Sequence, residues 1–166
     1  MASELVALFR RITSGVYVIG VADGERRNAF TAAWVMHVSF QPLQVVLAIV
    51  PSHASYPLLV ASGRFTVNVL TAGQLHLARH FGSESGRAAD KLAGVAWHPA
   101  ASGAPILDDA LAWLDCRVER RGPGGDPELV IARVVDGALV LPDERPLFYS
   151  DTGELDGSSA LYPDRF

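Results

Sequence analysis

The chain has 166 residues, of which 49% are hydrophobic and 19% charged, and its formal net charge is −4. This composition predicts a single globular domain over residues 1–166, excludes a disordered chain and argues against a nucleic-acid partner, which usually meets a basic surface. The chain has one cysteine, and its N-terminus lacks a signal-peptide pattern. No apolar run approaches the length of a membrane span, about 20 residues. These features predict a cytoplasmic protein without a membrane partner.

The first part of the chain predicts a helix and a hairpin. Ser3 is a typical N-cap, and four apolar side chains share one face of the helix that follows it, namely Leu5, Leu8, Phe9 and Ile12. Gly15 ends this helix, and the β-rich residues 16–21 predict a strand. The polar residues 23–28 then form the turn of a hairpin.

Residues 27–59 contain two predicted strands and the start of a helix, and the other elements are arranged around them. Residues 34–40 alternate as on a strand with two distinct faces, and Gln41-Pro42 interrupts them. The apolar run 45–50 predicts a strand that is buried on both faces, and the polar residues 51–57 open a short helix.

Two strands thus bring small and hydroxyl side chains toward a helix start: Thr31, Ala32, Ala33 and Ser39 on the strands, with Ser52 and Ser55 at the helix. A helix start carries unpaired N–H groups and the positive end of the dipole, which suit a phosphate. Small side chains also let a flat ring approach the backbone, so the combination predicts a site for a planar ligand with a phosphate tail. In the alternative interpretation, Ser52 or Ser55 is an ordinary N-cap.

Beyond residue 56 the pattern predicts further strands and two helices. The helix over residues 56–61 ends at Ser62-Gly63, and a second helix follows the capping-box spacing of residues 71–74. The predicted strands are residues 65–70, 111–121, 129–135 and 139–141, the last introduced by the hairpin signal Asp136-Gly137, while residues 95–109 are expected to be irregular. Short strands joined mostly by hairpins predict a mainly β fold, a barrel with peripheral helices.

The sequence carries no motif for a metal or for a catalytic nucleophile. His76 and His80 have the i, i+4 spacing of a zinc pair, but they fall on the polar side of their helix, so no metal is expected. Cys116 lies on the apolar side of its strand and is expected to be a packed core residue. Neither a nucleophile elbow nor a glycine-rich phosphate loop is present, so no catalytic side chain is predicted.

Residues 28–35, Asn-Ala-Phe-Thr-Ala-Ala-Trp-Val, followed by residues 38–42, Val-Ser-Phe-Gln-Pro, resemble the signature of the short-chain flavin reductases. Segments 53–59, 65–70, 81–82, 90–92 and 112–116 fit the same pattern in order and spacing, so the resemblance covers almost the whole chain. It implies an FMN-binding split β-barrel of Greek-key order with about six strands, which forms a homodimer. It also implies a flavin reductase that passes a hydride from NAD(P)H to FMN, or to FAD, and supplies reduced flavin to a partner monooxygenase.

The resemblance also implies which residues hold the flavin. Those lining the isoalloxazine ring are Asn28, Phe30, Thr31, Ala32, Ala33 and Trp34, with Phe81 packed near the ring. Those along the ribityl chain and phosphate are Ser39, Val50, Ser52, Ser55 and Tyr56. Alternatively, Trp34 and Phe81 are ordinary core residues, the Thr31 hydroxyl bonds to backbone, and Arg87 and Lys91 belong to a solvated loop rather than to a phosphate site.

One departure concerns the nicotinamide. Many flavin reductases carry Gly-Asp-His in the hairpin after the long strand, whereas this chain has Gly125-Asp126-Pro127, and Ala132 stands where a glycine is expected. Proline supplies neither an imidazole nor an N–H donor. The alternative function is therefore a non-reductase flavin-binding protein or electron carrier. A dimeric ligand-binding scaffold is a third hypothesis.

Overall fold

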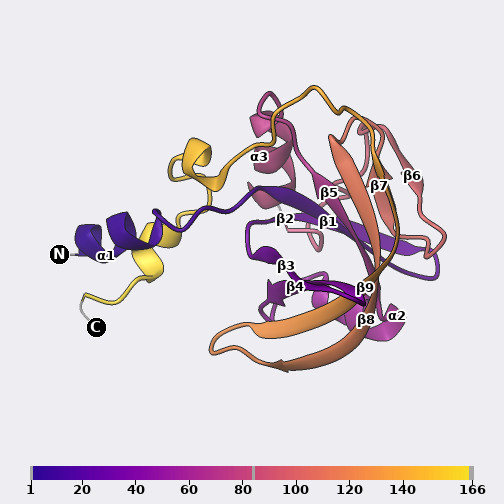
Figure 1. The fold of residues 1–166 in the computed structure, drawn as a ribbon, viewed down its shortest axis with the longest axis horizontal. Helices are drawn as coiled ribbons and strands as arrows, with labels where there is room; N and C mark the ends of the chain where they lie inside the picture. Colours follow the sequence, from indigo (N-terminus) through magenta and orange to yellow (C-terminus); the bar gives the residue numbers. More distant parts are fainter. Residues whose placement is uncertain (1, 84, 165–166) are drawn as a thin grey trace.

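The computed structural model describes residues 2–83 and 85–164, with backbone only for residues 2 and 3. Its centre is a seven-stranded antiparallel sheet in the order β2-β1-β5-β8-β9-β4-β3 (Figure 1). The strands are β1 (Tyr17–Asp23), β2 (Arg26–Ala32), β3 (Val35–Phe40), β4 (Leu43–Ile49), β5 (Arg64–Val69), β8 (Ala112–Pro123) and β9 (Glu128–Leu139). The mainly β fold predicted from the sequence is therefore confirmed.

The sheet curls into a split barrel. Its two edge strands, β2 and β3, follow each other in the chain with only Ala33 and Trp34 between them, yet they do not pair with one another. Strand β5 crosses over to join β1 beside β8, which gives the Greek-key order. The barrel is therefore open along the line where β2 meets β3.

One apolar cluster fills the barrel interior. Ile19 and Phe65 are fully buried there, as are Leu47 and Val130 on the opposite strands. Cys116 lies in the same interior, as predicted, and burial, with a smaller effect of Asp115, raises the pKa of its thiol to about 12. A thiol held in its protonated form inside a core is a packing group rather than a nucleophile.

Two helices cover the barrel. Helix α2 (Tyr56–Ser62) packs Leu58 and Leu59 into the interior cluster, and it ends at Gly63, whose left-handed backbone (φ 63°) lets its N–H donate to the Leu59 carbonyl. Helix α3 (Leu75–Ser83) covers the outer face of β1 and β2, where Ala78 and Phe81 join a second apolar cluster.

Two predictions from the second half of the chain are wrong. Asp136-Gly137 is not a hairpin, because β9 continues to Leu139; a Cβ at position 137 would lie 2.8 Å from the Trp113 carbonyl oxygen, so glycine permits close strand approach here. Residues 95–109 also contain a short hairpin, β6 (Trp97–Pro99) and β7 (Pro105–Leu107). The Asn68 side chain attaches this hairpin to the barrel by accepting the Leu107 N–H at 2.8 Å.

Both ends of the chain lie together beside the barrel, on the left of Figure 1. Helix α1 (Ala2–Phe9) packs chiefly against η2 (Ser158–Leu161), and η1 (Tyr149–Thr152) precedes it. We call residues 2–13 and 149–164 the terminal arm. The side chain of Ser3, the predicted cap of α1, lies outside the described residues. Within the described ranges, no helix combines the length and hydropathy needed to cross a bilayer.

Candidate functional site

Strand alternation divides the predicted ring-lining residues of β2 between two faces. Phe30 points into the barrel interior, whereas Ala29 belongs to the cluster under α3. Thr31 faces α3 as well, because its hydroxyl donates to the Ala78 carbonyl at 2.7 Å. The Thr31 hydroxyl therefore attaches α3 to the edge of the sheet, and Phe81, a residue of α3 that is only 1% exposed, packs from that helix into the same cluster.

Asn28 joins β2 to the turn before α2. Its amide donates to the Ser55 hydroxyl at 2.7 Å, and both side chains are buried. Ser55 makes no side-chain cap to α2, so its hydroxyl serves this contact instead. A Cβ at position 86 would lie 2.1 Å from the Asn28 amide nitrogen, so the loop at Gly86 packs directly on the same amide. Three segments of the chain therefore meet at Asn28.

His53 lies in this turn as a neutral donor. Its ring is tilted against Phe30 with a centroid separation of 4.4 Å, and its Nδ1 accepts the Ser55 N–H at 3.1 Å. Burial first, and then the charges of Lys91 and Arg87, lower the pKa of His53 to about 4. Because Nδ1 is the acceptor in the neutral ring, the proton sits on Nε2.

Two cations flank the same turn. Arg87 is exposed and donates to the Ser52 carbonyl at 3.2 Å. Lys91, the only lysine in the sequence, is 3% exposed, and its Nζ donates to the Phe81 carbonyl at 3.0 Å. Both charges act on His53, where they add to the effect of burial and lower the pKa of its ring. The alternative interpretation as a solvated loop agrees with Arg87, which is exposed, but not with Lys91, which is buried.

The N-terminus of helix α2 is a weak candidate for binding a phosphate. The helix is seven residues long with Pro57 in its first turn, so it offers few free N–H groups. The Tyr56 hydroxyl donates to Glu128 at 2.9 Å and accepts from Arg121 at 3.1 Å. These contacts hold the helix start against the β8–β9 hairpin.

The remaining predicted site residues lie at the end of β2, in the link to β3, on β3 and in the turn after β4. Ala32, Ala33 and Ser39 are half-buried, Trp34 is 65% exposed, and Val50 and Ser52 are exposed. Edge strands carry backbone N–H and C=O groups that no ladder partner satisfies. The split between β2 and β3 can therefore bind the polar edge of a planar heterocycle, with the cationic turn nearby.

Pro127 lies close to this region. Glu128 pairs with Ile49 at the end of β4, so the preceding proline sits beside the start of the turn at Val50. The Pro127 carbonyl accepts the Gly124 N–H at 3.0 Å, which closes the hairpin. At this position the hairpin therefore carries an apolar ring rather than a hydrogen-bond donor.

Metal chemistry has no counterpart in the described residues. No three His, Cys, Asp or Glu side chains gather there as metal ligands. His80 of the spaced pair instead places its Nε2 2.6 Å from the Lys91 carbonyl oxygen.

A split barrel that is open between β2 and β3 is the fold of a class of oxidoreductases that includes the flavin reductases. The flavin reductase like domain model matches residues 9–156, and the chain belongs to that family. Among curated relatives, Diflavin flavoprotein A 1 of Synechocystis sp. is 36% identical over 138 residues, which cover 82% of this chain. The chain spans about a quarter (24%) of that relative's length.

Solved structures agree with this assignment. An NADH:FAD oxidoreductase from Streptomyces globisporus, in complex with NAD and FAD fragments, is 29% identical with a TM-score of 0.82, covering 90% of this chain and 88% of its own. Nitrilotriacetate monooxygenase component B from Mycobacterium thermoresistibile is 30% identical with a TM-score of 0.78, covering 92% and 86% respectively. The shared fold therefore extends over nearly the whole chain.

Proposed function

We propose that the protein is a flavin reductase that transfers a hydride from NAD(P)H to FMN or FAD. The observation that carries this proposal is the turn at Ser52 to Ser55, where neutral His53 lies among the charges of Arg87 and Lys91. In this proposal the turn holds one anionic group and the adjacent split holds one planar ring, and a flavin nucleotide has both.

The chain's own residues bind and orient, while the flavin and nicotinamide supply the redox chemistry. Edge-strand backbone groups of residues 31–34 meet the polar side of the ring, and Ala32 and Ala33 leave space for it. The Asn28–Ser55 hydrogen bond fixes the turn, and Arg87 with the His53 Nε2–H attracts the phosphate. No side chain needs to transfer a proton in this scheme.

We favour FMN as the smaller ligand that satisfies both features, with FAD as the alternative. A homodimer would cover Trp34, which a lone subunit leaves 65% exposed at the ring site. Reduced flavin would then diffuse to a partner oxygenase, a role that the likeness to a monooxygenase component supports.

A second candidate function is a flavin carrier without reductase activity. Pro127 favours it, because the hairpin beside the site offers no hydrogen-bond donor to a nicotinamide. Anaerobic mixing of purified protein with FMN or FAD and with NADH or NADPH separates the candidates. Steady donor oxidation supports the reductase, flavin binding without oxidation supports the carrier, and failure to bind either flavin overturns both.

A further inference from the structure

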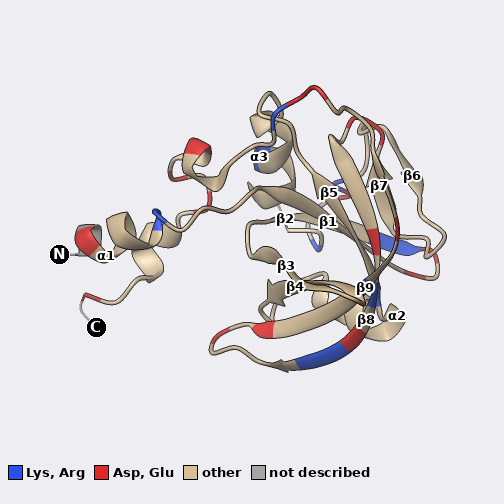
Figure 2. Cartoon of the chain, in the orientation of Figure 1, with Lys and Arg blue, Asp and Glu red and all other residues tan. Residues whose placement is uncertain are grey.

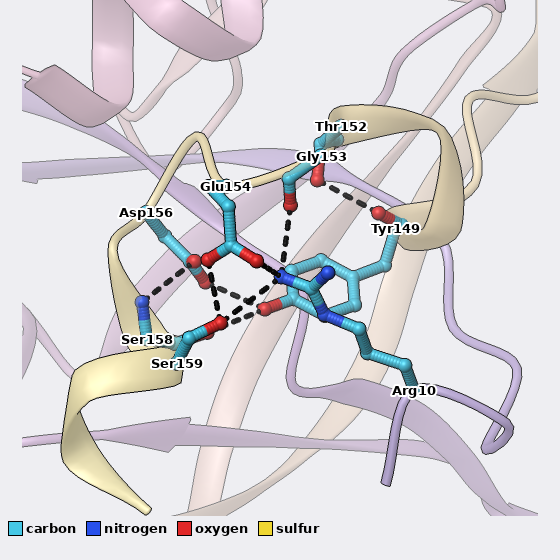
Figure 3. A network of polar contacts seen from close by, with 8 residues as sticks. All are labelled: Arg10, Tyr149, Thr152, Gly153, Glu154, Asp156, Ser158 and Ser159. Carbon is cyan, nitrogen blue, oxygen red and sulfur yellow. Dashed lines mark hydrogen bonds and ion pairs between the residues drawn. The ribbon is translucent and has the colours of Figure 1, made fainter. Parts of the chain in front are cut away.

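The terminal arm is held together by polar contacts that converge on Arg10 (Figure 3). The Arg10 guanidinium pairs with Glu154 at 2.5 Å and donates to the Gly153 carbonyl at 3.1 Å and to the Ser159 hydroxyl at 3.3 Å. Because Arg10 follows α1 and its acceptors all belong to the C-terminal segment, the two ends of the chain form one unit.

A second set of contacts stiffens the C-terminal half of the arm. The Tyr149 hydroxyl lies 2.8 Å from both the Asp156 carboxylate and the Ser158 hydroxyl. The rings of Phe9 and Tyr162 contact each other at 5.5 Å between centroids, with their planes tilted by 46°. Hydrogen bonds to Ser158 and Tyr149 outweigh burial and lower the pKa of Asp156, so its carboxylate is charged at neutral pH.

The terminal arm nevertheless leaves much apolar surface uncovered. Leu8 is 54% exposed, Ile12 67% and Leu161 83%. A hollow of about 660 Å³ also lies between α1 and the C-terminal segment, lined in part by Val6, Arg10 and Ser150. An eight-residue helix has little stability of its own in water, so α1 depends on packing, and its exposed apolar side chains are available for more of it.

A second uncovered surface runs along the edge strand β3. Phe40 is 86% exposed, Trp34 65% and Met36 63%, with Val38 and Leu43 also exposed. Figure 2 shows β3 without acidic or basic residues, and edge strands usually carry such charges when they face water. We call these five side chains the β3 row.

We infer that the terminal arm of each copy lies on the β3 row of a second copy of this chain. This inference rests on the homodimer of the proposed function, and it adds which surfaces of the two copies are in contact. In Figure 1 the arm and β3 lie on the same side of the barrel. A two-fold pairing covers both surfaces on both copies at once, as an isologous interface requires.

The size of the surfaces fits a second copy. The β3 row and four arm side chains (Leu8, Phe9, Ile12 and Leu161) are each between 42% and 86% exposed. At on the order of 50–100 Å² each, they offer roughly 500–900 Å² per copy, against about 800 Å² per partner in a standard interface. The family match covers residues 9–156, so nearly all of α1 and the whole of η2 lie beyond the shared region.

Cross-linking tests where the arm lies. Cys116 is fully buried, so a single introduced cysteine reacts cleanly. Differently tagged Ile12→Cys and Phe40→Cys chains are mixed, bound to FMN and treated with a short bismaleimide. We expect a covalent heterodimer, and none when Val60→Cys, on the exposed side of α2, replaces Phe40→Cys. A dimer by light scattering without a specific Ile12–Phe40 product overturns the inference and leaves the proposed dimer standing.

Sedimentation equilibrium tests whether the contacts of Arg10 within the arm support the dimer. Arg10→Ala should raise the dimer dissociation constant at least tenfold, since it frees the two halves of the arm. Arg26→Ala is the matched control. Arg26 also makes an exposed ion pair, with Asp23 at 2.6 Å, but neither residue belongs to the arm. Equal dissociation constants for the two variants, or a wild-type monomer that still binds FMN, would overturn the inference; FMN affinity measured alongside reports separately on the proposed function.

Discussion

The Asn28 amide donates a 2.7 Å hydrogen bond to the Ser55 hydroxyl, and the two buried side chains join β2 to the turn before α2. Gly86 packs on the same amide, so the loop that carries Arg87 is positioned by this bond as well. The position of the cationic turn, which includes the exposed Arg87, therefore depends on a contact inside the protein.

Removal of this bond should destabilise the fold and the site together. Asn28→Ala leaves the Ser55 hydroxyl buried without its donor, which should cost about 1–3 kcal/mol of unfolding free energy. The double variant with Ser55→Ala should cost less than the sum of the two single variants. Urea denaturation measures this, with Ser83→Ala on the exposed end of α3 as the control. Strictly additive losses would show that the two side chains are not coupled.

The ring pocket depends on small side chains at the split. Ala32→Leu should weaken flavin binding more than tenfold, or about 1.4 kcal/mol, because the larger side chain takes the space of the ring. Thr31→Ala should instead cost about 1 kcal/mol of unfolding free energy, because its hydroxyl donates to the Ala78 carbonyl. Flavin fluorescence quenching measures the affinities, urea denaturation measures the stability, and Ala101→Leu on an exposed turn is the control. An unchanged affinity in Ala32→Leu would place the ring elsewhere.

Arg87 should discriminate flavins by their phosphate. Arg87→Gln is expected to lower FMN affinity about tenfold and to leave riboflavin, which has no phosphate, unchanged. The wild-type preference for FMN should also shrink at high salt, because Arg87 is exposed. Arg79→Gln on α3 keeps the change in charge but lies on another exposed surface, and serves as control. Equal losses for FMN and riboflavin would rule out a phosphate contact.

His53 gives stability a defined pH dependence. Its pKa falls from 6.5 to about 4 on folding, so between these values the unfolded chain binds a proton that the folded chain does not. Stability should therefore decline as the pH drops through this window and be fully restored above it. His53→Gln should reduce the difference between urea unfolding at about pH 5 and about pH 7.5 by roughly 1–2 kcal/mol, allowing for the half-exposed ring. An unchanged difference between the two pH values in His53→Gln would refute the assignment.

Pro127 should limit the nicotinamide rather than the flavin. We expect poor saturation by NAD(P)H in the native protein, because the hairpin offers only an apolar ring. Pro127→His should lower the apparent KM for the donor and change flavin affinity by less than about twofold. Anaerobic initial rates against NADH and NADPH measure the effect, and Asp126→His, at the exposed neighbouring position, controls for an added imidazole. Saturation of the native protein at low micromolar donor would contradict this prediction.

Local pattern was enough to predict most of the barrel. Strands such as β4 and β5 bury alternate or continuous apolar residues, so periodicity reveals them directly. The β6–β7 hairpin was missed because its strands are short and bounded by proline, and its attachment depends on Asn68, 39 residues before Leu107. The hairpin predicted at Asp136-Gly137 was wrong because glycine is favoured both in a turn and where two strands approach closely, and the sequence does not distinguish the two.

The candidate site was harder to predict than the fold. The resemblance selected Asn28 and Ser55, but no sequence pattern shows that they bond to each other across 27 residues. Strand alternation alone does separate Phe30 from Thr31, and that signal was available. The role of Arg87 depends on where a loop folds back, which neither composition nor spacing determines.

Residues 14–16 pair with residues 147–149, so the N-terminal and C-terminal segments leave the barrel side by side. Val16 donates to the Leu147 carbonyl and Tyr149 to the Ser14 carbonyl, so both chain directions leave at the same place. A protein domain fused at either terminus would therefore start from the same side of the barrel. An affinity tag at either end would likewise be tethered to the terminal arm, so surface immobilisation would hold the molecule by this appendage and leave the far side of the barrel facing solution.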